Sequence, residues 1–270
     1  MTQPHWPNGA KAAISFTMDN LGEAQDVNLF QWDAPLGSHP SVKEHLPRML
    51  DMLDEHGIKA TYFVESWSLG VYADVVRDMA RRGHEVAWHG YQHERWPTLS
   101  EDDEVLNFQR SFAAAEEFGV RYDGFRPPGG LVNDRTWDLL RRHGVKYISP
   151  LGKLEIREGV VVLPFDWKAV DAFYYMEKFG PIREAHGEQT DMLSPSYFEE
   201  HLLSMIRETV EAEGYMSILF HPFLQESEEK LAVMERVLGR LASDTSIWCA
   251  PCRDVADWVA RNEAVVTPAD

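Results

Sequence analysis

The sequence predicts an α/β protein folded as a single-domain, distorted (β/α) barrel with seven or eight parallel strands. The main observation is a junction that recurs along the chain: a helical pattern, then a glycine, then a short apolar run. Glycine closes a helix by adopting the left-handed conformation, and a short apolar run is typical of a buried parallel strand. Alternating strands and helices imply right-handed crossovers, and hence a barrel. No stretch rich in Gly, Ser or Pro divides residues 1–270, so we expect one domain.

The expected strands differ in strength. The first, residues 12–18, has no helix before it. Five more follow a glycine that ends a helical pattern, and two weaker ones are short apolar runs. These later segments are residues 58–64, 84–88, 120–122, 145–148, 160–163, 215–220 and 246–248.

Helix signals lie between these strands. Ser100, with Asp103 three residues on, forms a partial capping box. Asn133 and Ser194 precede two other helical patterns, the second with a proline in its first turn. The expected helices are residues 100–118, 136–143, 195–213 and 230–241.

Two long connections interrupt the alternation, residues 20–47 and 164–193, and both carry aromatic side chains. Long loops in a compact domain are usually functional or make contacts between subunits. We therefore expect each insertion to serve as a lid or as an oligomer contact.

Composition excludes some classes of function. The formal net charge is −18, which disfavours binding to nucleic acid or to an anionic membrane surface. No apolar run approaches the roughly 20 residues of a membrane span. The start of the chain lacks the charged and apolar regions of a secretory signal, so we expect a cytoplasmic protein. Cys249 and Cys252 are expected to be a buried pair of reduced thiols.

Polar residues follow the expected strands, and in a barrel the loops after strands gather at one mouth. His89 and His93 are four residues apart, so on a helical turn they would share one face and reach one divalent ion. With 11 histidines in the chain, this spacing alone decides little. The case depends on the other residues placed after strands, which are Asp19, Asn20, Arg126, Asp166, Asp171 and His221.

This ordered set resembles the polysaccharide deacetylase family, which is carbohydrate esterase family four. The resemblance spans about residues 10 to 260 and implies a distorted (β/α) barrel with metal-dependent hydrolysis of acetyl groups. It is closest to an intracellular branch with peptidoglycan-deacetylase-like proteins and metal-independent allantoinases. The matching motifs are Thr17-Met18-Asp19-Asn20, His89 with His93, Arg126-Pro127-Pro128-Gly129, Leu163-Pro164-Phe165-Asp166-Trp167 with the acidic and aromatic run from Asp171 to Tyr175, and Ile218-Leu219-Phe220-His221.

One departure leaves two interpretations open. The family has two adjacent aspartates, a base and a metal ligand, but here the second is Asn20, and a neutral amide is a poor ligand for zinc. In the first interpretation Asp19 joins His89 and His93 as the metal ligand, and the base lies elsewhere, with Asp171 the candidate. In the second, Asp19 is the base and the metal is weak or absent. We favour the first, because two imidazoles without an anion would bind a divalent ion poorly.

The resemblance also implies roles for the remaining residues. His221 would protonate the departing amine, and Arg126 would pair with Asp166 or Asp171 to position the base. The cofactor would be a divalent metal ion, most simply Zn²⁺, and the substrate an N-acetylated sugar or a small amide. Two alternatives are a metal-independent cyclic-amide hydrolase and a non-catalytic protein that binds carbohydrate or a metabolite. Members of this branch are often tetramers, so a homo-oligomer is expected.

Overall fold

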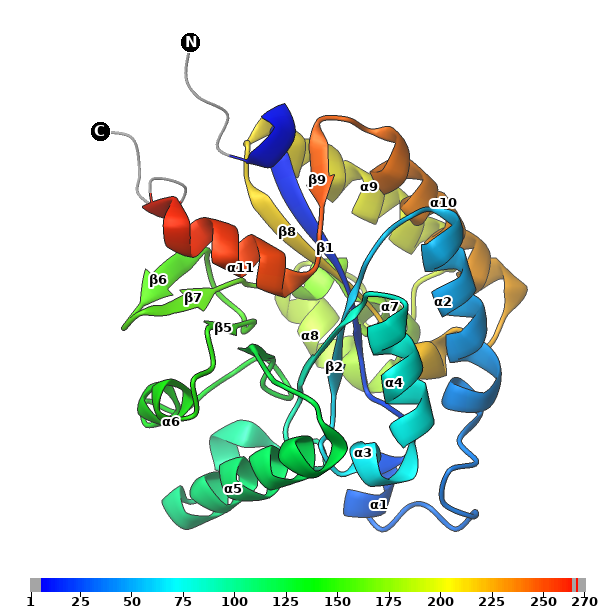
Figure 1. The fold of residues 1–270 in the computed structure, drawn as a ribbon. Helices are drawn as coiled ribbons and strands as arrows, with labels where there is room; N and C mark the ends of the chain where they lie inside the picture. Colours follow the sequence, from blue (N-terminus) through cyan, green and yellow to red (C-terminus); the bar gives the residue numbers. More distant parts are fainter. Residues whose placement is uncertain (1–5, 264–265, 267–270) are drawn as a thin grey trace.

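The computed structural model describes residues 6–263 and Val266, and its sheet curls into a distorted barrel (Figure 1). The expectation about a secretory signal rests partly on residues 1–5, which lie outside the described residues. The sheet has nine strands in the order β6-β7-β5-β4-β3-β2-β1-β8, with β9 also paired to β1. The strands are β1 (Ala12–Asp19), β2 (Thr61–Val64), β3 (Glu85–Trp88), β4 (Gly124–Phe125), β5 (Tyr147–Ile148), β6 (Glu155–Arg157), β7 (Val160–Val162), β8 (Tyr215–Phe220) and β9 (Ile247–Cys249).

The barrel prediction is confirmed, with two qualifications in how it closes. All strand pairs are parallel except β6 with β7, and the sequence pattern did not indicate β6, because its side chains are only partly buried. The edge strands β6 and β8 do not pair with each other. A single parallel bridge between Val170 and Leu219 instead joins the segment after β7 to β8. The barrel is therefore completed by isolated backbone contacts rather than by a full ladder.

The expected strand at residues 120–122 is wrong. Gly119 has φ +67° at the end of α5 (Glu101–Phe118), and the Val120 N–H donates to the carbonyl of Ala115. This closure of the helix uses the first backbone donor that a strand would need. β4 consequently begins only at Gly124.

The helix starts agree better with the sequence. Ser100 and Ser194 cap α5 and α9 (Pro195–Glu211) as expected, each accepting from a backbone N–H three residues on. Asn133 does not cap α6 (Thr136–Arg142), because its side-chain amide donates to the Trp96 carbonyl and to Glu104. The other α-helices are α1 (Ala24–Asn28), α2 (Leu46–Glu55), α3 (Ser68–Val71), α4 (Ala73–Arg81), α7 (Asp171–Tyr175), α8 (Gly180–Ala185), α10 (Glu228–Ser243) and α11 (Cys252–Arg261).

The two ends of the barrel differ in character. The end of α11 lies with η1 (Pro7–Gly9) towards the top of Figure 1, and α1 and α3 lie at the bottom, where the parallel strands finish. The first N–H groups of α11 donate to side chains of two strands. The Cys252 N–H donates to Thr61 Oγ1 of β2 at 2.8 Å, and the Arg253 N–H donates to Glu85 Oε2 of β3 at 2.9 Å. Cys249 and Cys252 are both free, and burial raises the pKa of the Cys252 thiol to about 11. The cysteines are thus free thiols, as expected, but only Cys252 is buried and Cys249 is half-buried.

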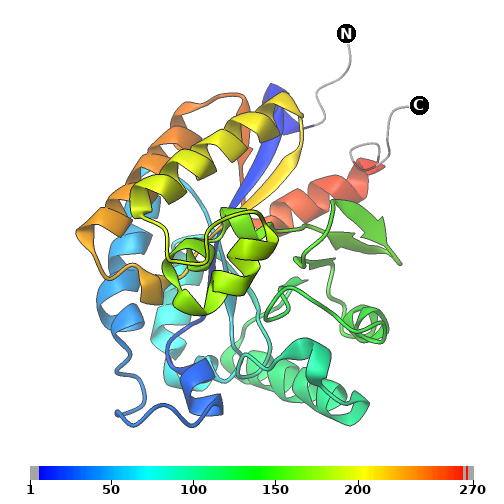
Figure 2. The same cartoon turned by 180° about the vertical axis from the view of Figure 1, so that it is seen from behind.

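The insertion at residues 164–193 folds into a lobe of short helices, seen in front of the sheet in Figure 2. The buried Arg183 guanidinium holds this lobe together by donating to the carbonyl oxygens of Phe173, Met176 and Thr190. In the other insertion, residues 20–47, the Phe30 side chain is 97% exposed. A role as lid or oligomer contact stays a prediction for both. Among the described residues, no helix combines the length and apolar character needed to cross a membrane.

The narrow barrel makes Gly124 a sensitive position. A Cβ there would overlap the buried ring of Tyr147, whereas a Cβ at Gly214 would meet nothing closer than 3.9 Å. We expect Gly124→Ala to lower the free energy of unfolding by about 1–3 kcal/mol through overpacking. Denaturant titration with Gly214→Ala as the matched control tests this. Equal stability of the two variants would contradict it.

Candidate active site

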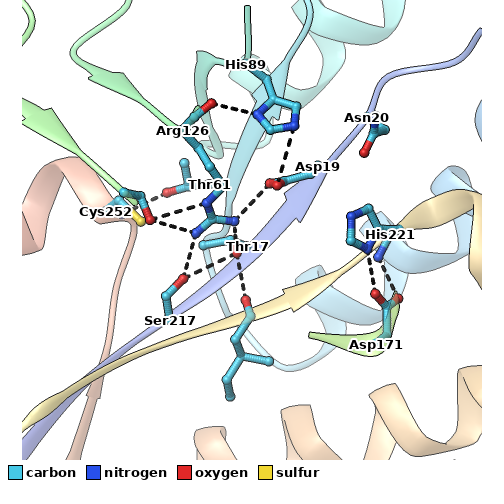
Figure 3. A network of polar contacts seen from close by, with 12 residues as sticks. Thr17, Asp19, Asn20, Thr61, His89, Arg126, Asp171, Ser217, His221 and Cys252 are labelled. Atoms are coloured by element: carbon cyan, nitrogen blue, oxygen red, sulfur yellow. Dashed lines mark hydrogen bonds and ion pairs between the residues drawn. The ribbon is translucent and has the colours of Figure 1, made fainter. Parts of the chain in front are cut away.

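Four polar side chains from distant parts of the chain meet where the strands end. Asp19 ends β1, His89 follows β3, Arg126 follows β4 and His221 follows β8, and Figure 3 shows them around one space. All four are buried. The expectation that strand-end residues converge at one mouth therefore describes this structure correctly.

Arg126 is the centre of the network, and its guanidinium is 1% exposed. Nη1 donates to Thr17 Oγ1 at 2.8 Å and to Asp19 Oδ1 at 2.9 Å, and Nη2 donates to the hydroxyls of Ser149 and Ser217. The guanidinium also lies 4.2 Å from the centroid of the Phe63 ring. Its charge is thus balanced by one carboxylate and solvated by hydroxyl groups.

The expected pairing of Arg126 with Asp166 or Asp171 is wrong. Asp166 is exposed and caps a 3-10 turn through the N–H of Lys168. Asp171 is fully buried but binds other groups, described below. Only Asp19, across the barrel at the end of β1, lies within ion-pair distance of Arg126 among the described residues.

The His89 ring is held in one tautomer. Its Nδ1 lies 2.7 Å from the carbonyl oxygen of Arg126, which can only accept, so Nδ1 carries the proton and Nε2 keeps a lone pair. Burial lowers the pKa of His89 to about 3, so the ring is neutral. Nε2 faces Asp19 Oδ2 at 3.7 Å. Two acceptors that face each other in this way leave room for a cation or a water molecule between them.

The His89 and His93 rings lie together, with centroids 4.9 Å apart, but not on a helical turn. The segment is an irregular loop in which Gly90 has φ +82° and His93 has φ +62°. Glu94 stabilises this loop by accepting from the N–H groups of Tyr91 and Gln92. The two imidazoles lie close together, as expected. An irregular loop brings them together, not the helical turn that the spacing suggested.

Glu65 is the residue that the sequence reasoning missed. Its carboxylate, with His89 and His93, forms a group whose ligand atoms all lie within 4.8 Å of one another. This group differs from the expected ligand set, in which Asp19 rather than Glu65 joins the two histidines, and that set stays a prediction. One carboxylate and two neutral imidazoles match the donor set of a catalytic zinc site. Glu65 directly follows the strand run that ends at Val64, so the same strand-end rule could have found it.

Asn20 contacts the new carboxylate directly. Its Nδ2 donates to Glu65 Oε1 at 3.0 Å, and the N–H of Leu21 donates to Glu65 Oε2 at 2.9 Å. Asn20 has φ +65°, a conformation that asparagine tolerates better than most residues. The Tyr62 hydroxyl donates to the Asn20 carbonyl oxygen at 2.8 Å. The loop after β1 therefore donates a hydrogen bond to each carboxylate oxygen of Glu65.

His221 and Asp171 form the second pair at the mouth. Asp171 Oδ1 lies 2.6 Å from His221 Nδ1, and Oδ2 accepts from the His221 N–H and from Gln225 Nε2. Because a carboxylate accepts at Nδ1, Nε2 is the His221 nitrogen left for a substrate. Both Asp171 oxygens are occupied, which does not suit the role of general base that the first interpretation suggested.

Comparison with known proteins finds a family match over part of the chain. The model for polysaccharide deacetylases matches residues 28–148. A crystal structure of a polysaccharide deacetylase from Mycobacterium smegmatis, so described only provisionally, superposes with a TM-score of 0.77 at 26% identity, over 98% of this chain and 95% of that one. Over residues 28–148, less than half of its length, the chain is similar to the polysaccharide deacetylase family. A crystal structure of Puue allantoinase has the same fold as this chain, with a TM-score of 0.77 at 19% identity, over 96% of this chain and 93% of that one.

Among curated proteins, the peptidoglycan deacetylase of Helicobacter pylori is 25% identical over 127 residues, 47% of this chain and 43% of its own. The first three curated relatives are matched over only 39%, 43% and 35% of their own lengths. The family match includes Glu65, both loop histidines and Arg126, but Asp19 and His221 lie outside it. Their place in the site therefore rests on the geometry above.

Proposed function

We propose that this protein is a metal-dependent hydrolase that cleaves the C–N bond of an N-acyl group on an N-acetylated sugar or small amide. The observation that carries the proposal is one carboxylate and one imidazole beside a potential metal group. Asp19 Oδ2 faces His89 Nε2 at 3.7 Å, and Figure 3 shows His221 beside the same space. An acyl-transfer site needs this combination of a base, an acid and an electrophile.

The residues divide into three roles. A divalent ion such as Zn²⁺, held by His89, His93 and Glu65, would supply Lewis-acid polarisation of the acyl carbonyl. Asp19 is the base, because Arg126 occupies its Oδ1 and leaves Oδ2 to take the proton of the attacking water. His221, oriented by Asp171 and present as the imidazolium, donates its Nε2 proton to the departing amine and becomes neutral. In this assignment Asp19 is the base, as in the second of the two interpretations from the sequence. That interpretation had no anionic metal ligand, and Glu65 takes that role here.

Removal of metal is expected to abolish turnover without unfolding the chain. The barrel is held by a hydrophobic core, so only the local arrangement of the site depends on an ion. Dialysis against a chelator should eliminate hydrolysis, re-addition of Zn²⁺ should restore it, and the near-ultraviolet circular dichroism should stay constant. Turnover that survives complete chelation would instead favour the metal-independent cyclic-amide hydrolase.

The substrate is best sought by a screen of acetylated sugars, allantoin and formamides, each with and without chelator. Zinc-dependent release of acetate or formate from the acetylated sugars or formamides, or zinc-dependent opening of the allantoin ring, supports the proposal. Binding of a sugar without any turnover, in zinc-loaded protein, would point to the non-catalytic alternative.

A further inference from the structure

Position 20 carries an amide where the family motif has its second aspartate, and the carboxylate of Glu65, which follows β2, accepts a hydrogen bond from it. We propose that the anionic metal ligand of this chain has moved from position 20 to Glu65, and that Asn20 is the positioning residue that aims it. The inference rests on the proposed metal dependence. In it, Asn20 orients the ligand Glu65 and does not itself bind the metal.

The contacts fix the Glu65 carboxylate in one orientation. Oε1 accepts from Asn20 Nδ2 at 3.0 Å, and Oε2 accepts from the N–H of Leu21 at 2.9 Å. Glu65 is 1% exposed, so water does not compete for these positions. A carboxylate oxygen has two lone-pair sites, so one acceptor site on each oxygen stays free for an ion beside His89 and His93.

An amide at position 20 is required by this arrangement. A carboxylate has no hydrogen to donate, so an aspartate there would place its oxygen against Glu65 Oε1 as a like charge. Asp19 is the next residue, and Arg126 is the one cation within ion-pair distance of it among the described residues. Three buried carboxylates with one guanidinium would repel each other. Hence Asn20→Asp, which recreates the family motif, should weaken metal binding rather than strengthen it.

The opposite outcome follows if position 20 is the natural ligand position. Asn20→Asp would then supply the missing ligand and tighten zinc binding, and Glu65→Gln would have little effect. The two hypotheses therefore predict opposite signs for one substitution.

The test is zinc affinity, measured by competition with a chelating dye, for the parent, Glu65→Gln, Asn20→Asp and the double variant. We expect Asn20→Asp to weaken binding about 10–100-fold, the usual range for a group that orients a ligand, and Glu65→Gln to weaken it at least as much. The double variant, with the charge at 20 and the amide at 65, should bind more tightly than either single variant. Cobalt absorption spectra of the loaded proteins should show the same order.

Two controls keep the result interpretable. Asn107→Asp introduces a carboxylate at another buried asparagine, 5% exposed on α5, and should leave zinc affinity within twofold of the parent. Thermal unfolding of each metal-free variant shows whether it is folded. Parent-like zinc affinity in Glu65→Gln, or tighter binding in Asn20→Asp, overturns this inference and leaves metal-dependent hydrolysis standing. A parent that binds no zinc overturns both.

Discussion

Replacing His221 with alanine is expected to lower turnover by about 10²–10⁴-fold, the usual contribution of a general acid, while bound zinc is retained. The imidazole is aimed by Asp171 at 2.6 Å, and it is not one of the three groups that surround the potential ion. Loss of the ring removes the proton for the departing amine but leaves those groups in place. Steady-state kinetics with zinc analysis of the same samples measures both quantities.

A matched control for this substitution is His201→Ala on α9, a half-buried histidine that stacks on Tyr197. It should keep parent turnover. A His93→Ala variant provides the complementary result, loss of zinc together with loss of turnover. If His221→Ala hydrolyses substrate at the parent rate, the proton donor is another group and the assigned role is wrong.

Replacing Arg126 with methionine is expected to lower the free energy of unfolding by about 3–5 kcal/mol, as removal of one partner of a buried ion pair does, and to abolish turnover. Methionine fills much of the arginine volume but donates no hydrogen bond, so the Asp19 carboxylate loses its counter-charge. The hydroxyls of Ser149 and Ser217 also lose the partner that occupies the middle of the barrel. Chemical denaturation measures the stability, and product release measures the activity.

Arg157→Met is the matched control, because it also removes an arginine that lies over an aromatic ring. Arg157 is 4.4 Å from the centroid of Trp137, but its side chain is 44% exposed and its contact with Asp134 is 3.9 Å long. Exposed pairs contribute about 0–1 kcal/mol. Similar losses in the two variants would show that the Arg126 network does not stabilise the barrel.

Much of the fold could be predicted because glycine-ended helices and apolar runs are local features. The capping serines are also local features, and so is the apolar spacing of Leu231, Met234 and Leu238 along α10, all three of which are buried. The strand at β4 was misplaced because the apolar residues that follow Gly119 pack against the end of α5 instead of entering the sheet. A local pattern cannot distinguish these two uses of apolar side chains.

The site was predictable in part. Asp19, His89, His93, Arg126 and His221 were found by the rule that residues after parallel strands share one end of a barrel. Glu65 obeys the same rule, because it directly follows β2, but it belongs to none of the motifs on which the family resemblance rests. The role of Asp171 could not be found this way, since its partner His221 lies 50 positions further along the chain and in another element.

By itself, the sequence determined which residues would stand at the mouth, because strand direction and strand ends are encoded within a few neighbouring residues. Only the tertiary structure decided the partners. Arg126 and Asp19 are 107 positions apart and meet because their side chains point into the barrel from different strands. Which charge faces which depends on the distance and direction of side chains across that interior, and these are set by the whole fold. For the same reason, the contact between Asn20 and Glu65 could be read only from the folded chain.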